Sequence, residues 1–295
     1  NNMKRIFGTG VALITPFNED KTIDYPSLEK LINKVIEGGI DFLVVLGTTG
    51  EATSINESEK NELINFIVKL NNKRLPLVLG LGGNNTNKLI KEINNTDLSD
   101  FDAILSVTPY YNKPSQKGLY HHYAEISKSS PIPIILYNVP SRTGVNMSPE
   151  ITIQLANDFK NIISIKEASG DINQIKYILK NKPKNFDVLS GDDGLTLEII
   201  QNGGAGVISV IGQSNPIEFS SLVKFALNGK LSDAKLLHDK LYGLYHYLYS
   251  EGNPSGVKAF LSLQGVCKNY LRLPLVPMSS ELFNDFKIYL ANEVN

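Results

Sequence analysis

Short apolar runs alternate with amphipathic stretches along most of the chain. Each run is almost continuously apolar, which is typical of a parallel strand covered on both faces. The runs occupy residues 10–14, 42–46, 75–80, 103–107, 133–137, 162–166, 186–190 and 206–210. The pattern therefore predicts eight buried strands.

Helical spacing follows each run, as in Leu28, Leu31, Ile32 and Val35. The expected helices cover residues 28–36, 57–70, 86–95, 116–129, 148–158, 171–181, 195–201 and 217–228. Eight strand–helix units predict an α/β fold, a closed (β/α)8 TIM barrel. A doubly wound sheet is the alternative, but Thr15-Pro16-Phe17-Asn18 is not the phosphate loop that normally follows its first strand.

The alternation stops after Gly229. Residues 230–295 show helical patterns only, with breaks at Asn253-Pro254 and Leu273-Pro274. We therefore expect a catalytic barrel over residues 1–229 and a C-terminal helical segment over 230–295. The segment is expected to support assembly, and its Asn253-Pro254 corner is a candidate to line a site.

Composition narrows the function classes. The 295 residues include 29 basic and 30 acidic side chains, so no charge excess predicts a nucleic acid or a membrane surface as partner. The single Cys267 excludes an internal disulfide and a cysteine-rich metal site, and favours a reducing, cytoplasmic location. We expect no membrane span or secretory signal, because no apolar run has the length or position. The four histidines form no metal-binding pattern, so no metal is expected.

Lys166 ends the sixth apolar run. A buried ammonium is costly to desolvate, and such burial favours the neutral amine that attacks a carbonyl. A lysine in this position can equally extend its head group into solvent or pair with an acid. The neighbouring strand ends decide between these interpretations.

Active sites of such barrels lie at the carboxyl ends of the strands. Tyr137 ends the fifth run, beside Lys166, where a phenol can exchange protons with a forming imine. Thr48 and Thr49 follow the second run between glycines, whose N–H groups can bind an anion. Arg142 supplies a fork suited to a carboxylate. The set predicts Schiff-base chemistry on a small keto acid.

Each motif also has a structural explanation. The Gly47-Thr48-Thr49-Gly50 turn could cap a helix, Tyr110 and Tyr111 could be packing aromatics, and Arg142 could be an exposed loop cation. The pair Asp192-Asp193 is at least as consistent with a helix cap as with a ligand pair.

Several spaced motifs resemble the dihydrodipicolinate synthase/N-acetylneuraminate lyase family of pyruvate-dependent class I aldolases. The resemblance spans essentially the whole chain. It rests on Gly8-Thr9-Gly10-Val11, Gly47-Thr48-Thr49-Gly50-Glu51, Tyr137-Asn138-Val139-Pro140, Ile165-Lys166-Glu167, Asn253-Pro254-x-x-Val257-Lys258 and Leu271-Arg272-Leu273-Pro274. It implies no organic cofactor and a homotetramer built as a dimer of tight dimers.

The resemblance also implies residue roles. Lys166 forms the imine with pyruvate, and Tyr137 is the general acid and base. Thr49 and Tyr111 complete a proton relay with Tyr137, and Tyr111 comes from the neighbouring subunit. Thr48 and Thr49 hold the pyruvate carboxylate, while the backbone at Gly191 and Ile208 lines the pocket.

Arg142 favours the synthase branch of the family, in which an arginine holds the carboxylate of aspartate semialdehyde during diaminopimelate and lysine biosynthesis. The alternative is an aldolase acting on N-acetylneuraminate or a keto-deoxy sugar acid. Lysine-inhibited members carry histidines and an acid where this chain has Glu57, Lys60 and Lys88, so feedback by lysine is expected to be weak or absent.

Overall fold

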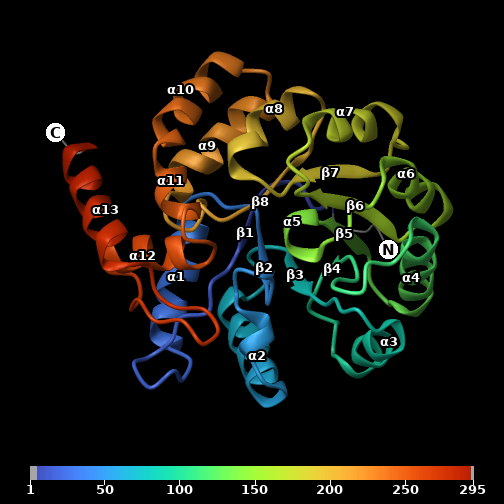
Figure 1. Cartoon of the computed structure of the whole chain (residues 1–295), viewed down its shortest axis with the longest axis horizontal. Helices are drawn as coiled ribbons and strands as arrows, with labels where there is room; N and C mark the ends of the chain where they lie inside the picture. The colour runs from blue at the N-terminus through green and yellow to red at the C-terminus, as the bar shows by residue number, and fades with distance from the viewer. Residues whose placement is uncertain (1–4, 294–295) are drawn as a thin grey trace.

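Eight parallel strands form a closed barrel in sequence order in the computed structural model, which describes residues 5–293 (Figure 1). The strands are β1 Gly8–Ala12, β2 Phe42–Val45, β3 Leu77–Gly80, β4 Ala103–Val107, β5 Ile134–Asn138, β6 Ile162–Glu167, β7 Asp187–Ser190 and β8 Gly206–Ser209. Pairing of β1 with β8 closes the ring. The (β/α)8 prediction is confirmed.

The α-helices that follow the strands form an outer ring (Figure 1). They are α1 Tyr25–Glu37, α2 Glu57–Asn71, α3 Thr86–Asn95, α4 Gln116–Ser129, α6 Pro149–Asp158, α7 Ile172–Asn181, α8 Thr196–Gln201 and α9 Pro216–Leu227. Their first turns are fixed by local chemistry. Asn85, Ser115, Ser148 and Asp171 each accept a hydrogen bond from a backbone N–H of the first turn.

The loop after β5 contains a short helix that the periodicity did not predict, α5 Pro140–Thr143. Four residues are too few to show a helical repeat. Two 3-10 turns, η1 Ala52–Ser54 and η2 Asp193–Leu195, were missed for the same reason.

The core has two layers. Phe42, Val44, Ile135 and Leu189 fill the barrel interior with other apolar side chains, while a larger cluster lies between the strands and the helices. Both faces of each strand are thus covered, which explains the nearly continuous apolar runs.

The described part of the C-terminal segment, residues 230–293, contains four helices joined by loops. They are α10 Leu231–Tyr242, α11 Leu244–Tyr249, α12 Ser255–Leu263 and α13 Ser280–Glu293. Figure 1 shows them together on one side of the barrel, with α13 outermost. All but the last two residues of α12 are buried. Within the described residues, every helix falls short of the length and apolarity that crossing a membrane demands.

Candidate active site

Lys166 and Tyr137 lie side by side at the carboxyl ends of β6 and β5, because the parallel register pairs these two residues directly. The Lys166 side chain is buried, with 7% of the residue exposed. Its Nζ lies 4.1 Å from the centroid of the Tyr137 ring. An amine and a phenol thus share one wall of the barrel mouth, as the sequence predicted.

Gly191 follows β7 and packs against the Lys166 side chain. A Cβ at this position would lie 3.2 Å from Cε of Lys166 and 2.7 Å from Cβ of Ala168. Any larger residue at position 191 would therefore require Lys166 or Ala168 to move. Ile208 is buried in β8 and belongs to the same interior cluster as Tyr137.

The turn of residues 47–51 follows β2 and holds both threonines. Thr48 is exposed, whereas Thr49 is 3% exposed and accepts a hydrogen bond from Nδ2 of Asn253 at 2.8 Å. Thr15 Oγ1 donates to the carbonyl oxygen of Gly50 at 2.7 Å, which fastens the turn to the loop after β1. The two hydroxyls therefore have different surroundings, a difference that their adjacent positions in the sequence did not predict.

Arg142 lies on α5 and is exposed. Its Nη2 donates to the carbonyl oxygen of Asn253 at 3.3 Å. The guanidinium is therefore partly anchored, yet it retains donors for an anionic group.

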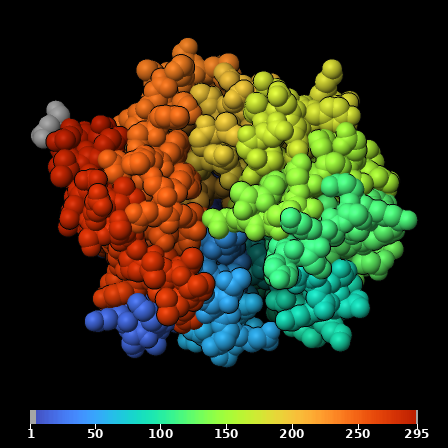
Figure 2. All heavy atoms as spheres, viewed as in Figure 1, coloured from blue at the N-terminus to red at the C-terminus, as the bar shows by residue number. Residues whose placement is uncertain are grey.

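A cavity of about 630 Å³ joins several of these residues. Thr48, Tyr137 and Arg142 line it together with Asn84 and Tyr110. Figure 2 shows a hollow near the centre of the same face of the molecule that Figure 1 presents. The volume is in the range of small-molecule sites.

Tyr111 is placed differently from the other candidates. Its residue is 88% exposed, with a left-handed φ of 76°, and its backbone N–H donates to the carbonyl oxygen of Thr143. Among the described residues that line the cavity, its neighbour Tyr110 is present and Tyr111 is not. Tyr111 therefore lies outside the lining of this cavity, and its participation from a neighbouring subunit stays a prediction.

Asp192 and Asp193 have structural roles. The Asp192 side chain accepts from the N–H of Gly194 and caps η2. The Asp193 carboxylate accepts from the N–H groups of Val210 and Ile211, and burial raises its pKa. Within residues 5–293, no cluster of three histidine, cysteine or acidic residues is suited to a metal ion.

The sequence did not predict a buried ion pair beneath the turn. Lys258 Nζ lies 2.6 Å from Oε2 of Glu51, and both side chains are almost fully buried. Lys258 is in the C-terminal segment, in a motif that only the family resemblance singles out. The residues around Lys258 in α12 are mostly small or apolar, and they carry no local signal of its partner Glu51.

The chain matches the model of the dihydrodipicolinate synthetase family over residues 5–292. It is 50% identical to the 4-hydroxy-tetrahydrodipicolinate synthase of Flavobacterium psychrophilum over 287 residues, 97% of this chain and 98% of that protein. The structure of the Aquifex aeolicus dihydrodipicolinate synthase is similar with a TM-score of 0.93 and 39% identity, covering 97% and 98% of the two chains. That of the Acinetobacter baumannii enzyme complexed with pyruvate gives 0.94 and 37%, covering 98% and 99%.

Proposed function

The chain belongs to the dihydrodipicolinate synthetase family, and on this basis we propose that it acts as a 4-hydroxy-tetrahydrodipicolinate synthase that joins pyruvate to L-aspartate 4-semialdehyde. The observation that carries the proposal is the buried Lys166 amine beside the ring of Tyr137, which lines a cavity together with Arg142. The pyruvate complex of the Acinetobacter baumannii relative supports the first substrate.

The reaction begins when the neutral Lys166 amine attacks the ketone carbon of pyruvate. Water leaves, and the protonated imine withdraws electrons from the adjacent methyl group. Loss of a methyl proton gives an enamine, whose carbon attacks the aldehyde. The amino group of the second substrate then displaces Lys166 and closes the ring, which returns the free amine.

Tyr137 is positioned to exchange protons with the forming imine, and Thr49 continues this relay. Thr48 and the glycine-flanked turn receive the pyruvate carboxylate, next to the pocket wall made by Gly191 and Ile208. Arg142 receives the carboxylate of aspartate semialdehyde, since its exposed guanidinium lines the cavity mouth.

The enzyme assembles as a homotetramer, a dimer of dimers, in which Tyr111 of one subunit completes the relay of its neighbour. The exposure of the Tyr111 side chain supports this arrangement, because a large aromatic at 88% exposure is available to a second subunit. We also infer a cytoplasmic location, which the single free cysteine favours.

The decisive test is borohydride reduction in the presence of pyruvate. The peptide that contains Lys166 should gain a stable adduct, and Lys166→Ala or Lys166→Arg should lose activity by roughly 10³-fold or more, because neither supplies a neutral amine. Lys184→Ala changes an exposed lysine and serves as the control. Labelling of a different lysine, or no labelling, would contradict the mechanism.

A coupled assay decides the substrate. Aspartate semialdehyde with dihydrodipicolinate reductase should give turnover, whereas N-acetylneuraminate should not be cleaved. The reverse result would assign the chain to the aldolases that act on sugar acids.

A further inference from the structure

The C-terminal segment holds the turn that carries Thr49. Asn253 Nδ2 donates to Thr49 Oγ1, Lys258 Nζ contacts Oε2 of Glu51, and the backbone N–H of Arg272 donates to Oε1 of Glu51 at 3.0 Å. These three partners lie more than two hundred residues from the turn along the chain. The turn is therefore fixed by tertiary contacts in addition to its own backbone.

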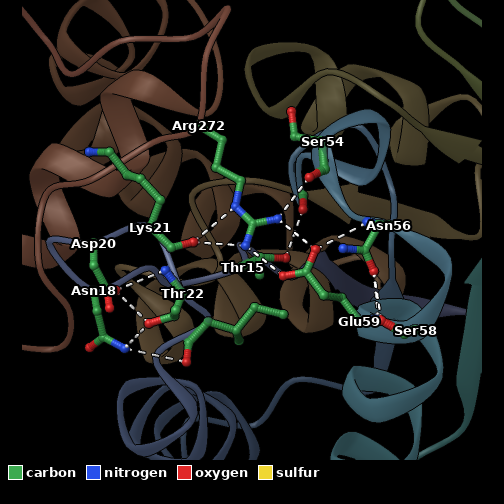
Figure 3. Close-up of polar contacts among 12 residues, drawn as sticks. Thr15, Asn18, Asp20, Lys21, Thr22, Ser54, Asn56, Ser58, Glu59 and Arg272 are labelled. Atoms are coloured by element: carbon green, nitrogen blue, oxygen red, sulfur yellow. Dashed lines mark hydrogen bonds and ion pairs between the residues drawn. The ribbon is translucent and has the colours of Figure 1, made fainter.

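Arg272 extends this attachment beyond the turn. Its guanidinium donates to the carbonyl oxygens of Lys21 and Ser54 and to the carboxylate of Glu59 (Figure 3). Figure 3 also draws Thr15, whose hydroxyl donates to the carbonyl oxygen of Gly50. The loops after β1 and β2 and the C-terminal segment thus form one connected polar unit.

In the contact with Thr49, Nδ2 of Asn253 is the donor and the threonine hydroxyl oxygen is the acceptor. A threonine hydroxyl carries one hydrogen and can accept two, whereas an amide NH₂ group only donates. Because Asn253 supplies the hydrogen in this contact, the hydroxyl hydrogen of Thr49 remains available for a different acceptor. Thr49 is only 3% exposed, so bulk water competes little for that hydrogen.

Asn253 also contacts Arg142, which lines the cavity. Its carbonyl oxygen accepts from Nη2 of Arg142 at 3.3 Å. One residue of the C-terminal segment therefore touches both the threonine of the relay and the arginine of the second substrate's site.

We propose that Asn253 is a positioning residue, whose amide orients the Thr49 hydroxyl so that its hydrogen is directed to the reacting groups beside Tyr137. This inference rests on the proposed relay through Thr49 and Tyr137. It gives the C-terminal segment a role in the chemistry in addition to assembly.

The variant Asn253→Asp tests the direction of this hydrogen bond. The substitution preserves the shape of the side chain, but an ionised carboxylate only accepts hydrogen bonds. The hydroxyl hydrogen of Thr49 would then turn to the carboxylate and be lost to the relay. Imine formation on Lys166 should persist, whereas formation of the enamine should slow.

Two measurements at saturating pyruvate separate these steps. Borohydride trapping reports the imine, and deuterium exchange of the pyruvate methyl group, followed by NMR, reports the enamine. We expect the amount of imine trapped in Asn253→Asp to lie within about twofold of that in the unaltered enzyme. The rate of methyl deuterium exchange should fall about 10²-fold, as for a misplaced catalytic group. Asn253→Ala should slow exchange less, because it frees the hydroxyl without capturing its hydrogen.

Two controls accompany the variant. Asn228→Asp introduces the same charge at the exposed end of α9 and should leave trapping and exchange unchanged. In a Thr49→Val background, Asn253→Asp should cause little additional loss, because the group on which it acts is already absent.

The outcomes distinguish failure of the positioning role of Asn253 from failure of the proposed enzymatic function. If the unaltered enzyme neither traps pyruvate nor exchanges its methyl protons, the proposed function fails. If it does both, and Asn253→Asp exchanges at the unaltered rate, the positioning role is refuted. An equal loss of trapping and exchange also refutes it, because that result indicates a disrupted pocket and not a redirected hydroxyl.

Discussion

Replacing Lys258 by methionine tests how strongly the C-terminal segment holds the turn after β2. Lys258 Nζ contacts Oε2 of Glu51 at 2.6 Å and the carbonyl oxygen of Tyr270 at 2.8 Å, and it lies 4.2 Å from the centroid of the Phe17 ring. The side-chain exposures of Lys258 and Glu51 are 0% and 1%. Burial lowers the pKa of the Lys258 ammonium, although the Glu51 carboxylate opposes that effect.

Among residues 5–293, the substitution leaves the buried Glu51 carboxylate with one hydrogen-bond donor, the backbone N–H of Arg272. Removing one member of a buried pair costs about 3–5 kcal/mol, most of it from the uncompensated charge. The double variant Lys258→Met/Glu51→Gln removes that charge while Gln keeps an acceptor for the N–H of Arg272. Its loss should fall to about 1–3 kcal/mol, the cost of the missing polar contacts.

Thermal unfolding followed by circular dichroism measures the difference. Lys258→Met should lower Tm by on the order of 10 °C, and the double variant should recover part of this loss. Lys235 and Asp239 form a matched control pair at 2.7 Å, but their side chains are 67% and 56% exposed. Lys235→Met should change Tm by no more than ~2 °C, because solvent screens such pairs. A similar small change for Lys258→Met would refute the argument from burial.

Two further predictions follow from charged groups near the cavity and in the helix layer. L-lysine should inhibit weakly, because Lys60 and Lys88 line the cavity together with Asn84 and their ammonium groups repel the ammonium of the inhibitor. Lys88→Glu should strengthen inhibition. Half-inhibition of the unaltered enzyme at submillimolar lysine would contradict this prediction. Burial lowers the pKa of His122 from 6.5 to about 4, so its neutral form contributes stability above pH 6.5 that is lost as the pH falls from 6.5 towards 4. The loss should reach about 3 kcal/mol in urea unfolding at a series of pH values, and a His122→Gln variant with the same pH dependence would exclude this residue as its source.

Local chemistry explains why most of the barrel was predictable. Strands covered on both faces have continuous apolar runs, and side-chain caps such as Ser115 and Ser148 mark where helices begin. Strand order then follows from the fold, so the adjacency of Tyr137 and Lys166 could be inferred before any coordinates. The short helix α5 was not predictable, because four residues contain no repeat.

The contacts that fix the site were less predictable. Asn253 and Thr49 are 204 positions apart, and Lys258 and Glu51 are 207 positions apart. Periodicity reports which face of a helix is apolar, but it does not report which distant group meets a given polar side chain. Lys258 illustrates this limit, since it lies in the buried part of α12 and nothing in the local sequence names the acid that its ammonium meets.

The candidate site includes contacts from residues beyond 229, where the strand–helix repeat ends. Helices of the C-terminal segment could pack against a barrel without touching its mouth, and apolar burial alone would hold them there. Instead, the segment places Asn253 against Thr49 and Arg142, and it places Lys258 against Glu51. A buried charge and a buried hydroxyl both require partners at defined distances, so these contacts fix the position of the turn more tightly than apolar packing would. The turn that carries Thr48 and Thr49 thus follows β2 in the sequence, but contacts from the C-terminal segment fix its position.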